Sequence, residues 1–575
     1  MSGVRGLRDP NVQVNVGSTR SIFYQDVNVT LSNATDFLLP WYLNYAGNWS
    51  DPIQCMTAGS NGWQANHGAL NGDLNNKWAE ANTPYSLGYY KRSDLPVHFG
   101  IAEGWTVADM YQQSVIASTT PNRVSWFSGS INCPGGPQTP DQGGMTIDNS
   151  DTPGCELPNT NCYPFSWKTY AEYLQDAGIT WQVYQDEDNF GDNAPPWFTQ
   201  FQNAPNISEL YQRGMTFVGL EKFYADARAG TLPAVSYIIG PAELSEHPPY
   251  QPKDGAWLQQ QVVNAVTTGD AYNSSVLMIS YDETGGWGDH VTPFHSPVGT
   301  AGEWVQDPYG QFGDVYTGPG FRLPFYIISP WTRGGRVFTE HADHSSQLKF
   351  MEQWLAAKGH DVVTTQIPAW RRAHMSDLVN AFDFTSEPDL SLPAVPLAET
   401  PSTDASGTWN GYAVCEATYF VTQPPVPYGQ QSSSTSLVTE DGFKKVIGYL
   451  TEGRYLVFES SGIALERTGN GTVGAGIATS QHENQAQRWI LHQLPDWQSS
   501  TETFEISSVI DGTYIGNGLD LVKAGSAATI TVKDLGNGKG YTMGIGRRYV
   551  GVRGKKLVIE STAATWNVYS VTYGD

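Results

Sequence analysis

Residues 276–290 read VLMISYDETGGWGDH. The run Val276–Ile279 is apolar without alternation, which is typical of a strand buried on both faces of a sheet. It leads to two adjacent acidic residues, Asp282 and Glu283, which would stand at the carboxyl end of that strand. The glycines that follow let the chain turn sharply and approach a ligand. This stretch therefore predicts a buried strand with a functional edge.

The chain around this stretch repeats its pattern between about residues 98 and 360. Together with Val276–Tyr281, the predicted strands are Ile179–Tyr184, Ala234–Ile239 and Leu323–Ile328. Apolar residues at helical spacing predict helices around residues 167–174, 258–266 and 348–355. Alternating strands and helices favour an α/β fold with a mostly parallel sheet flanked by helices. In such sheets ligands bind beyond the carboxyl ends of the strands.

The adjacent carboxylates of Asp282 and Glu283 would repel each other at a strand end unless a cation lies between them. A hard divalent metal ion would relieve that repulsion. The alternative is a solvated acidic turn after a strand. We favour the metal site because Gly285-Gly286 and Asp289-His290 follow directly.

A second motif is Ser118-Thr-Thr-Pro-Asn-Arg123. Pro121 fits the first turn of a helix, where its missing N–H costs nothing. One interpretation is plain capping by a Ser or Thr hydroxyl, and the spacing alone favours it. The other uses the same geometry, because helix N–H groups stabilise an anion beside a hydroxyl that acts as a metal-activated nucleophile. The candidate nucleophile is Thr119.

Two histidines are candidates for the same site. His247 lies in Ser245-Glu-His-Pro-Pro249, after the predicted strand 234–239, where the prolines would hold it toward the carboxyl edge of the sheet. A surface histidine in a proline-rich turn is the more common alternative. His67 carries no signal from its neighbours, and His344 reads as the start of a helix.

The last part of the chain changes character. Residues 421–440 form a Pro/Ser-rich linker between a domain of residues 1–420 and a domain of residues 441–575. The last domain has many glycines, short β-type runs and a loose repeat of Gly-x-Tyr and Arg-x-Tyr segments. It resembles a β-trefoil, with Gln487-Arg-Trp489 similar to the Gln-x-Trp signature of ricin-type trefoils. Glycan binding is one interpretation, and a structural β-domain with a buried Trp is the other.

Composition excludes several classes of protein. The chain has 575 residues with 15% charged and 12% aromatic residues, which argues against disorder. The net charge of −25 repels phosphate backbones and anionic membrane surfaces, so we expect no nucleic-acid partner. The sequence has no apolar run of 18 or more residues, so we expect no transmembrane helix. The GxSxG, Walker A and HExxH motifs are also missing from the sequence.

Cysteine and sequon usage points to a secreted protein. Five cysteines allow at most two internal disulfides and leave one thiol. Six Asn-x-Ser/Thr sequons begin at Asn28, Asn33, Asn48, Asn206, Asn273 and Asn470. The start of the chain has no apolar segment typical of a signal peptide, which conflicts with this expectation.

Taken in order, these motifs resemble the phosphoesterase family of non-haemolytic phospholipases C and acid phosphatases. The resemblance rests on residues 88–130, SEHPP at 245–249, YDETGGWGDHV at 281–291, and LPFYIISPW at 323–331 with DHSS at 343–346. It implies an alkaline-phosphatase-like fold and hydrolysis of a phosphate ester through a covalent phosphoenzyme. It also implies a divalent metal ion held by Asp282, Glu283 and the Thr119 hydroxyl. His67 and His247 would bind phosphate oxygens or protonate the leaving group.

Three departures from the family pattern stand out. Thr284 replaces a usual His, and Ala117-Ser118 replaces a frequent Gly-Pro. The chain begins at a segment similar to the one just after the family's Glu-Asn metal motif, so we expect an N-terminally truncated chain. We therefore expect a phospholipase C-like enzyme acting on phospholipids. The alternatives are an acid phosphatase acting on monoesters and a catalytically impaired glycan-binding protein.

Overall fold

The computed structural model describes residues 1–149, 152–419, 422–494 and 502–574. The α-helices are α1 Trp63–Leu70, α2 Pro96–Gly104, α3 Thr119–Ser128, α4 Tyr170–Asp176, α5 Thr199–Gln202, α6 Glu209–Gly214, α7 Leu220–Arg228, α8 Pro252–Thr267, α9 His344–Ala357, α10 Ala369–His374, α11 Gly411–Tyr419 and α12 Ser433–Ser436. The strands before residue 440 are β1 Gln25–Asp26, β2 Phe37–Leu38, β3 Trp41–Tyr42, β4 Gly88–Tyr89, β5 Thr106–Ala108, β6 Trp181–Gln185, β7 Val235–Ile239, β8 Leu277–Ser280, β9 Trp304–Gln306, β10 Asp314–Tyr316, β11 Phe325–Ile328 and β12 Val337–Phe338.

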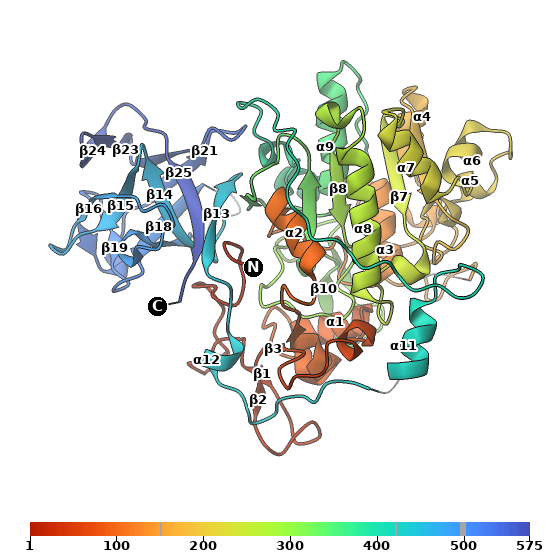
Figure 1. Cartoon of the computed structure of the whole chain (residues 1–575), viewed down its shortest axis with the longest axis horizontal. Coiled ribbons are helices and arrows are strands. Elements are labelled where there is room, and N and C mark those ends of the chain that lie inside the picture. The colour runs from red at the N-terminus through yellow and green to blue at the C-terminus, as the bar shows by residue number, and fades with distance from the viewer. Residues whose placement is uncertain (150–151, 420–421, 495–501, 575) are drawn as a thin grey trace.

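The four predicted strands are present as β6, β7, β8 and β11, and the three predicted helices as α4, α8 and α9. Thr169 begins α4 with a capping box to Glu172, which fixes the start of that helix. β11 is buried along its whole length and β6 nearly so, whereas β7 alternates between buried and partly buried residues and β8 is mostly partly buried. Tyr326 and Ile328 pack with α2, α7 and α8, whereas Phe325 and Ile327 pack in a different cluster (Figure 1).

The mostly parallel sheet was a wrong prediction, because the sheet is mixed. In the larger sheet β12 is parallel to β5, but β11 is antiparallel to both β8 and β5. β6 and β7 pair in parallel as a separate two-stranded sheet. The reason lies in the connection from β8 to β11. It contains the antiparallel hairpin of β9 and β10 and no helix, so the chain does not make the helical crossover that a parallel pair needs.

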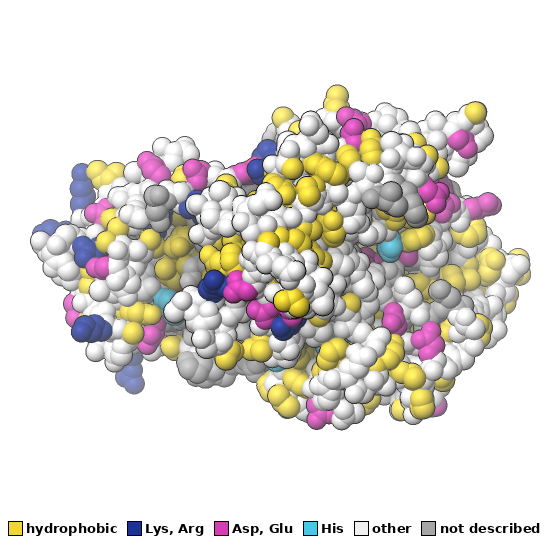
Figure 2. All heavy atoms as spheres, turned by 90° about the horizontal axis from the view of Figure 1, so that it is seen from below, with side chains coloured by type: hydrophobic (Ala, Val, Ile, Leu, Met, Phe, Trp, Pro, Cys, Tyr) yellow, Lys and Arg dark blue, Asp and Glu magenta, His cyan; other side chains and the backbone are white. Residues whose placement is uncertain are grey.

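The C-terminal lobe contains only strands and short 3-10 turns within its described residues from 442 on. Its strands are β13 Gly442–Ile447, β14 Tyr455–Ser460, β15 Ile463–Arg467, β16 Val473–Ile477, β17 Trp489–Gln493, β18 Thr503–Ser508, β19 Tyr514–Ile515, β20 Leu521–Val522, β21 Ile530–Asp534, β22 Tyr541–Ile545, β23 Arg548–Arg553, β24 Lys556–Glu560 and β25 Asn567–Thr572. In Figure 2 the visible Lys and Arg side chains gather over this lobe, and none is seen at the opposite end of the molecule.

The two lobes are joined by backbone pairing. β13 is parallel to β12, with Val446 opposite Val337, so the mixed sheet continues into the C-terminal lobe. The N-terminal end of the chain lies between the lobes in Figure 1. There the Gly3 amide donates to the Thr572 hydroxyl at 2.9 Å, and the Asn11 amide group donates to the Leu491 carbonyl at 2.9 Å.

A buried ion pair reinforces this joint. Arg454 of the C-terminal lobe donates from Nε to the Asp109 carboxylate at 2.9 Å, and both side chains are almost fully buried. The Arg5 amide donates to the same carboxylate at 2.8 Å. The lobes therefore share one continuous set of hydrogen bonds.

The predicted linker is also packed. The Gln431 side chain exchanges two hydrogen bonds with the Leu39 backbone, each 3.0 Å long, and the Tyr85 hydroxyl donates to the Pro424 carbonyl. These contacts tie it to the first 90 residues of the chain.

The cysteines follow the predicted count. Cys55 pairs with Cys415, Cys155 pairs with Cys162, and Cys133 is a buried thiol. Within the described residues, no helix has the length and apolar character needed to cross a membrane.

Candidate active site

The N-terminus of α3 presents Thr119. Ser118 is the N-cap residue, and its hydroxyl donates to Asp148 at 2.8 Å instead of capping the helix. The Asn122 amide group donates to the carbonyls of Val115, Ala117 and Ser118, which folds the preceding loop tightly against the first turn. Thr119 is 9% exposed, and its hydroxyl has no hydrogen-bond partner among the described residues. It is therefore available to a ligand.

One helical turn after Thr119, Arg123 connects α3 to two acidic residues. Its Nε donates to Asp282 at 3.0 Å, and its other amino group contacts Asp192 at 2.9 Å. Residues four apart lie on the same face of a helix. Thr119 and Arg123 therefore share one face of α3, and Arg123 binds the two acidic residues.

Asp282 and Glu283 stand at the carboxyl end of β8, as the sequence predicts. Glu283 is 7% exposed and accepts hydrogen bonds from the Asn61 amide group at 2.9 Å and the Gly285 amide at 2.6 Å. Burial and the Asp282 carboxylate raise the pKa of Glu283 to about 8. Although burial opposes ionisation, the Arg123 guanidinium holds the pKa of Asp282 below its usual range. The pair is thus short of positive charge.

The glycines after this pair make the predicted sharp turn. Gly285 and Gly286 have φ values of 60° and 81°, in the left-handed region that favours glycine. A Cβ on Gly286 would lie 2.5 Å from the Gly59 backbone. The absence of a Cβ at Gly286 therefore lets this turn approach the backbone of another loop of the protein.

Asp289 and His290 turn away from the carboxylate pair. Asp289 binds the Arg322 guanidinium at 2.7 and 2.8 Å, and His290 lies 3.3 Å from the Asp9 carboxylate. Arg322 also donates to the Arg5 carbonyl. Their presence in the motif favoured a metal site, but their contacts belong to the buried network near the lobe joint.

His344 fixes the backbone of Asp282. It is the first residue of α9, as predicted, and its Nε2 lies 2.7 Å from the Asp282 carbonyl oxygen. A carbonyl can only accept, so Nε2 carries the proton and Nδ1 accepts from the Tyr111 hydroxyl at 2.8 Å. Burial lowers the pKa of His344, which keeps this neutral form.

His247 lies in the loop that follows β7. Its Nδ1 donates to the Pro248 carbonyl at 2.9 Å, so Nε2 is the ring nitrogen that can take up or release a proton. The Phe190 ring packs against it with centroids 5.1 Å apart. Burial raises the pKa of nearby Asp192 to about 6, while the charges of Arg123 and His247 oppose that shift. His247 therefore belongs to the electrostatic surroundings of Arg123 and Asp192.

His67 has different neighbours. It lies in α1 and is 3% exposed, with Trp63 and Phe312 rings at 4.2 and 5.9 Å. Its Nε2 is buried without a hydrogen-bond partner among the described residues. Burial lowers the pKa of His67 to about 3, although Asp307 and Asp73 oppose the shift. No contact recorded within the described residues joins it to Thr119, Asp282 or Glu283.

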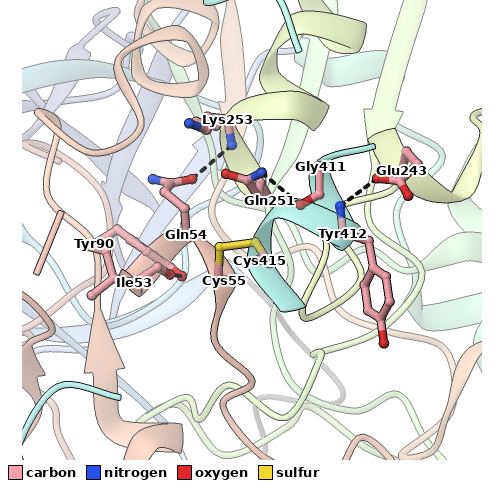
Figure 3. Close-up of a disulfide and its surroundings, with 10 residues drawn as sticks. All are labelled: Ile53, Gln54, Cys55, Tyr90, Glu243, Gln251, Lys253, Gly411, Tyr412 and Cys415. Atoms are coloured by element: carbon pink, nitrogen blue, oxygen red, sulfur yellow. Dashed lines mark hydrogen bonds between the residues drawn. A yellow bond between two sulfur atoms is a disulfide. The ribbon is translucent and has the colours of Figure 1, made fainter. Parts of the chain in front are cut away.

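A tethered helix lies beside the His247 loop. The Cys55–Cys415 disulfide holds α11, and the Tyr412 amide donates to Glu243 at 2.7 Å (Figure 3). Figure 3 also shows Gln251 bound to the Gly411 carbonyl and Gln54 bound to the Lys253 amide. The Tyr412 ring contacts Tyr250 with centroids 5.2 Å apart. The disulfide thus fixes a segment 360 residues away in sequence next to the candidate site.

The donor set at the end of β8 fits a hard divalent cation. Two adjacent carboxylates and a nearby hydroxyl are oxygen ligands, and the raised pKa of Glu283 marks a carboxylate that lacks a compensating charge. Among the described residues, no group of three or more His, Cys, Asp or Glu side chains is placed to hold a metal. Further ligands would have to be the Thr119 hydroxyl, the Asn61 amide oxygen, water or the substrate.

The sequence motifs did not identify several residues of this site. Arg123 was part of a quoted motif, but its bridge to Asp192 and Asp282 depends on chain segments 69 and 159 residues away. Asp192 follows an ordinary acidic run, and Asn61 precedes α1 without any motif. The strained left-handed backbone of Phe190, φ 58°, likewise has no sequence signal.

Residues 1–356 match the Phosphoesterase family, and the chain belongs to that family. It is 32% identical over 468 residues to a non-hemolytic phospholipase C of Burkholderia pseudomallei, covering 75% of this chain and 61% of the relative. It is 31% identical to a hemolytic phospholipase C of Pseudomonas aeruginosa, covering 75% and 60%. The chain thus spans about three fifths of the length of these relatives.

Among solved structures, a protein in the alkaline phosphatase superfamily from Vibrio parahaemolyticus aligns with 48% of this chain and 62% of its own chain. The TM-score is 0.26 and the sequence identity 14%.

Proposed function

We propose that this protein hydrolyses phosphoric ester bonds as a phospholipase C-like enzyme, with Thr119 as the nucleophile. The observation that carries the proposal is the position of Thr119 and Arg123 on one face of α3, with Arg123 bound to Asp282 beside the buried Glu283. A phosphate placed at the start of α3 would meet the Thr119 amide and the Arg123 guanidinium, because the Thr120 amide donates to Asn149 and Pro121 has no N–H. These local donors offset the −25 charge of the chain. The names of the phospholipase C relatives support the substrate class.

The residues have separable tasks in this reaction. The Thr119 oxygen attacks phosphorus while its proton passes to solvent, the bond from phosphorus to the leaving oxygen breaks, and a covalent phosphoenzyme forms on Thr119. When water hydrolyses the phosphoenzyme, the bond from phosphorus to the Thr119 oxygen breaks and that oxygen takes a proton back from solvent. His247 Nε2 gives a proton to the leaving alkoxide, and the same nitrogen then takes a proton from the water that hydrolyses the phosphoenzyme. Arg123 stabilises the charge on the phosphate oxygens.

Asp282, Glu283 and the Thr119 hydroxyl would hold a divalent cation. When bound, such an ion supplies Lewis-acid stabilisation of the phosphate and lowers the pKa of a nearby hydroxyl. His67, within α1, is given no task in this mechanism, because its described ring contacts are with Trp63 and Phe312.

We place the α/β part in the alkaline-phosphatase-like group of folds and the C-terminal lobe among β-trefoil-like domains. The sequence repeat around Tyr455, Tyr514 and Tyr549 supports the β-trefoil-like assignment. The residue after each tyrosine is at most 1% exposed: Leu456, Ile515 and Val550. Trp489 and Trp566 close two units, and each indole donates to a backbone carbonyl at 3.0 Å. Gln487 is buried against Glu466, which favours a structural role over glycan binding.

A secreted location fits the same features. All six sequon asparagines are exposed, and four of the five cysteines form disulfides. Surface sequons and disulfides are typical of proteins that fold in an oxidising compartment.

The test is hydrolysis of p-nitrophenyl-phosphorylcholine and p-nitrophenyl phosphate, measured side by side with a panel of divalent metal ions. Turnover that requires a metal supports the proposal, and faster cleavage of the diester favours a phospholipase C over an acid phosphatase. If both substrates stay intact with every metal, while residues 441–575 of the full chain bind a glycan array, the protein is a glycan-binding protein.

A further inference from the structure

Glu246, the residue before His247, receives three side-chain donors. His98 of α2 lies 3.1 Å from each carboxylate oxygen, Gln259 of α8 donates at 2.8 Å, and the Tyr281 hydroxyl donates at 2.8 Å. The side chain of Glu246 is only 10% exposed. These donors come from three separate elements, so the carboxylate is a junction between α2, α8 and the end of β8.

The backbone at Glu246 and at Gly255 accommodates the buried Glu246 side chain. Glu246 has a φ of 63°, a left-handed conformation that costs free energy for a residue with a side chain. A Cβ on Gly255 of α8 would lie 2.0 Å from the Glu246 Cγ, so the glycine leaves the space through which the Glu246 side chain passes. Because three donors hold Glu246 in a strained conformation, we infer that its position matters for the site.

We propose that Glu246 is a positioning residue for His247. Tyr281 directly precedes Asp282, and Glu246 directly precedes His247. The hydrogen bond from the Tyr281 hydroxyl to Glu246 therefore joins the two segments that carry these site residues. Among the described residues, the His247 ring itself contacts only loop residues: it donates a hydrogen bond to the Pro248 carbonyl and packs against the Phe190 ring. The carboxylate of Glu246 is therefore the link that fixes these loops relative to the end of β8. This role rests on the proposed function of the site.

The two acceptor oxygens of Glu246 are essential to this role. Gln259 and Tyr281 act as donors, and a carboxylate offers lone pairs to both of them and to the His98 ring at once. A glutamine in its place would turn an amide group toward one of the donors and leave a buried donor unsatisfied. Because such a mismatch costs more than the hydrogen bond itself is worth, the Ser245–Tyr250 loop would shift or loosen.

The experiment compares Glu246→Gln and Tyr281→Phe with Glu352→Gln in the full chain. Glu352 is a suitable control because it is also buried and hydrogen-bonded, by Arg372 and the Thr364 amide, but lies two turns into α9. Two quantities are measured: hydrogen exchange of residues 244–250, and kcat and KM for p-nitrophenyl-phosphorylcholine. We expect Glu246→Gln to lose exchange protection in this loop and to lower kcat about 10–100-fold with KM little changed.

The control variant should lose stability but keep both the loop protection and kcat. Tyr281→Phe should show a smaller version of the Glu246→Gln effect, and the double variant should be no worse than Glu246→Gln because the two residues share one contact. Unchanged protection or unchanged kcat in Glu246→Gln overturns the proposal. If the wild-type chain cleaves no phosphoester, the proposed function fails, and the exchange of residues 244–250 alone decides whether Glu246 anchors the loop.

Discussion

Arg123 reaches from α3 to the carboxylate of Asp282 at 3.0 Å, and this contact joins the helix that begins with the candidate nucleophile to the strand end that carries two acidic residues. The same guanidinium contacts Asp192 at 2.9 Å. One cation thus serves three acidic residues, since Glu283 lies next to Asp282. The site is acidic at its strand end and basic at its helix, which suits a phosphate bridged by a metal ion.

Removing the Arg123 guanidinium should leave the acidic residues of the site without a compensating positive charge. Arg123→Met leaves Asp192 and Asp282 without their partner, so we expect a loss of about 3 kcal/mol in the free energy of unfolding. Divalent metal should restore more stability to the variant than it adds to the wild type, because it then neutralises more uncompensated charge. Thermal unfolding with and without metal measures both effects. Equal metal stabilisation of the two proteins would argue against a cation site at Asp282.

The nucleophile assignment predicts a sharp difference between two neighbouring residues. Thr119→Ala should lower kcat by at least about 10³-fold, because no other hydroxyl would start the covalent step. Thr120→Ala is the matched control: the contact of Thr120 with Asn149 uses its backbone amide, at 2.9 Å, and survives the substitution. Similar activity in the two variants would remove Thr119 from the mechanism.

The joint between the lobes predicts that they unfold together. Arg454→Met leaves Asp109 buried without its partner, so we expect a loss of about 3–5 kcal/mol in one cooperative transition. Differential scanning calorimetry measures it. Arg467→Met is the control, because its pair with Asp511 is more exposed and lies within the C-terminal lobe. A separate early transition of the C-terminal lobe would show that the joint does not couple the two parts.

The two disulfides should differ in their effect on stability. Cys55–Cys415 closes a loop of 360 residues, whereas Cys155–Cys162 closes one of seven. In the chain-entropy model the longer loop contributes more, so replacing Cys55 and Cys415 by serine should cost about 4–5 kcal/mol and the other pair clearly less. Urea unfolding of the two double variants compares them. A larger loss from the Cys155–Cys162 pair would contradict this ranking.

The lowered pKa of His67 makes the free energy of unfolding depend on pH. Its pKa is about 3 in the folded protein against a usual value of 6.5, so the unfolded chain takes up the proton first as the pH falls. The stability that neutral His67 contributes is complete above pH 6.5 and is lost progressively toward pH 3. Comparing the wild type with His67→Gln at pH 7.5 and 4.5, we expect the difference in unfolding free energy to change by about 2–3 kcal/mol. A pH-independent difference would contradict the burial of a neutral ring.

Much of the fold could be predicted from local patterns, and the exceptions have identifiable causes. The runs that became β6, β7, β8 and β11 are mostly apolar, and their buried residues pack into clusters formed with helices and other strands. The direction of β11 could not be read from its own residues, since it depends on whether the connection before it forms a helix. The residues 281–324 do not, and the strand runs antiparallel.

The candidate site divides in the same way. Thr119, Asp282, Glu283 and His247 lie in local motifs with recognisable spacing. Arg123, Asp192 and His344 act through contacts between distant segments, such as the 2.7 Å hydrogen bond from His344 to the Asp282 carbonyl. Such partners become visible only when the chain is folded, because neither residue type nor spacing encodes them.

The decisive measurement is to trap the covalent intermediate. The metal-loaded protein is mixed with p-nitrophenyl-phosphorylcholine, quenched in acid within the first turnover and digested, and the peptides are analysed by mass spectrometry. We predict one phosphorylcholine group on Thr119, absent from the Thr119→Ala variant and formed no more slowly than p-nitrophenolate appears in steady state. Turnover by the wild-type protein with no labelled Thr119, or with the label on another residue, would contradict the mechanism.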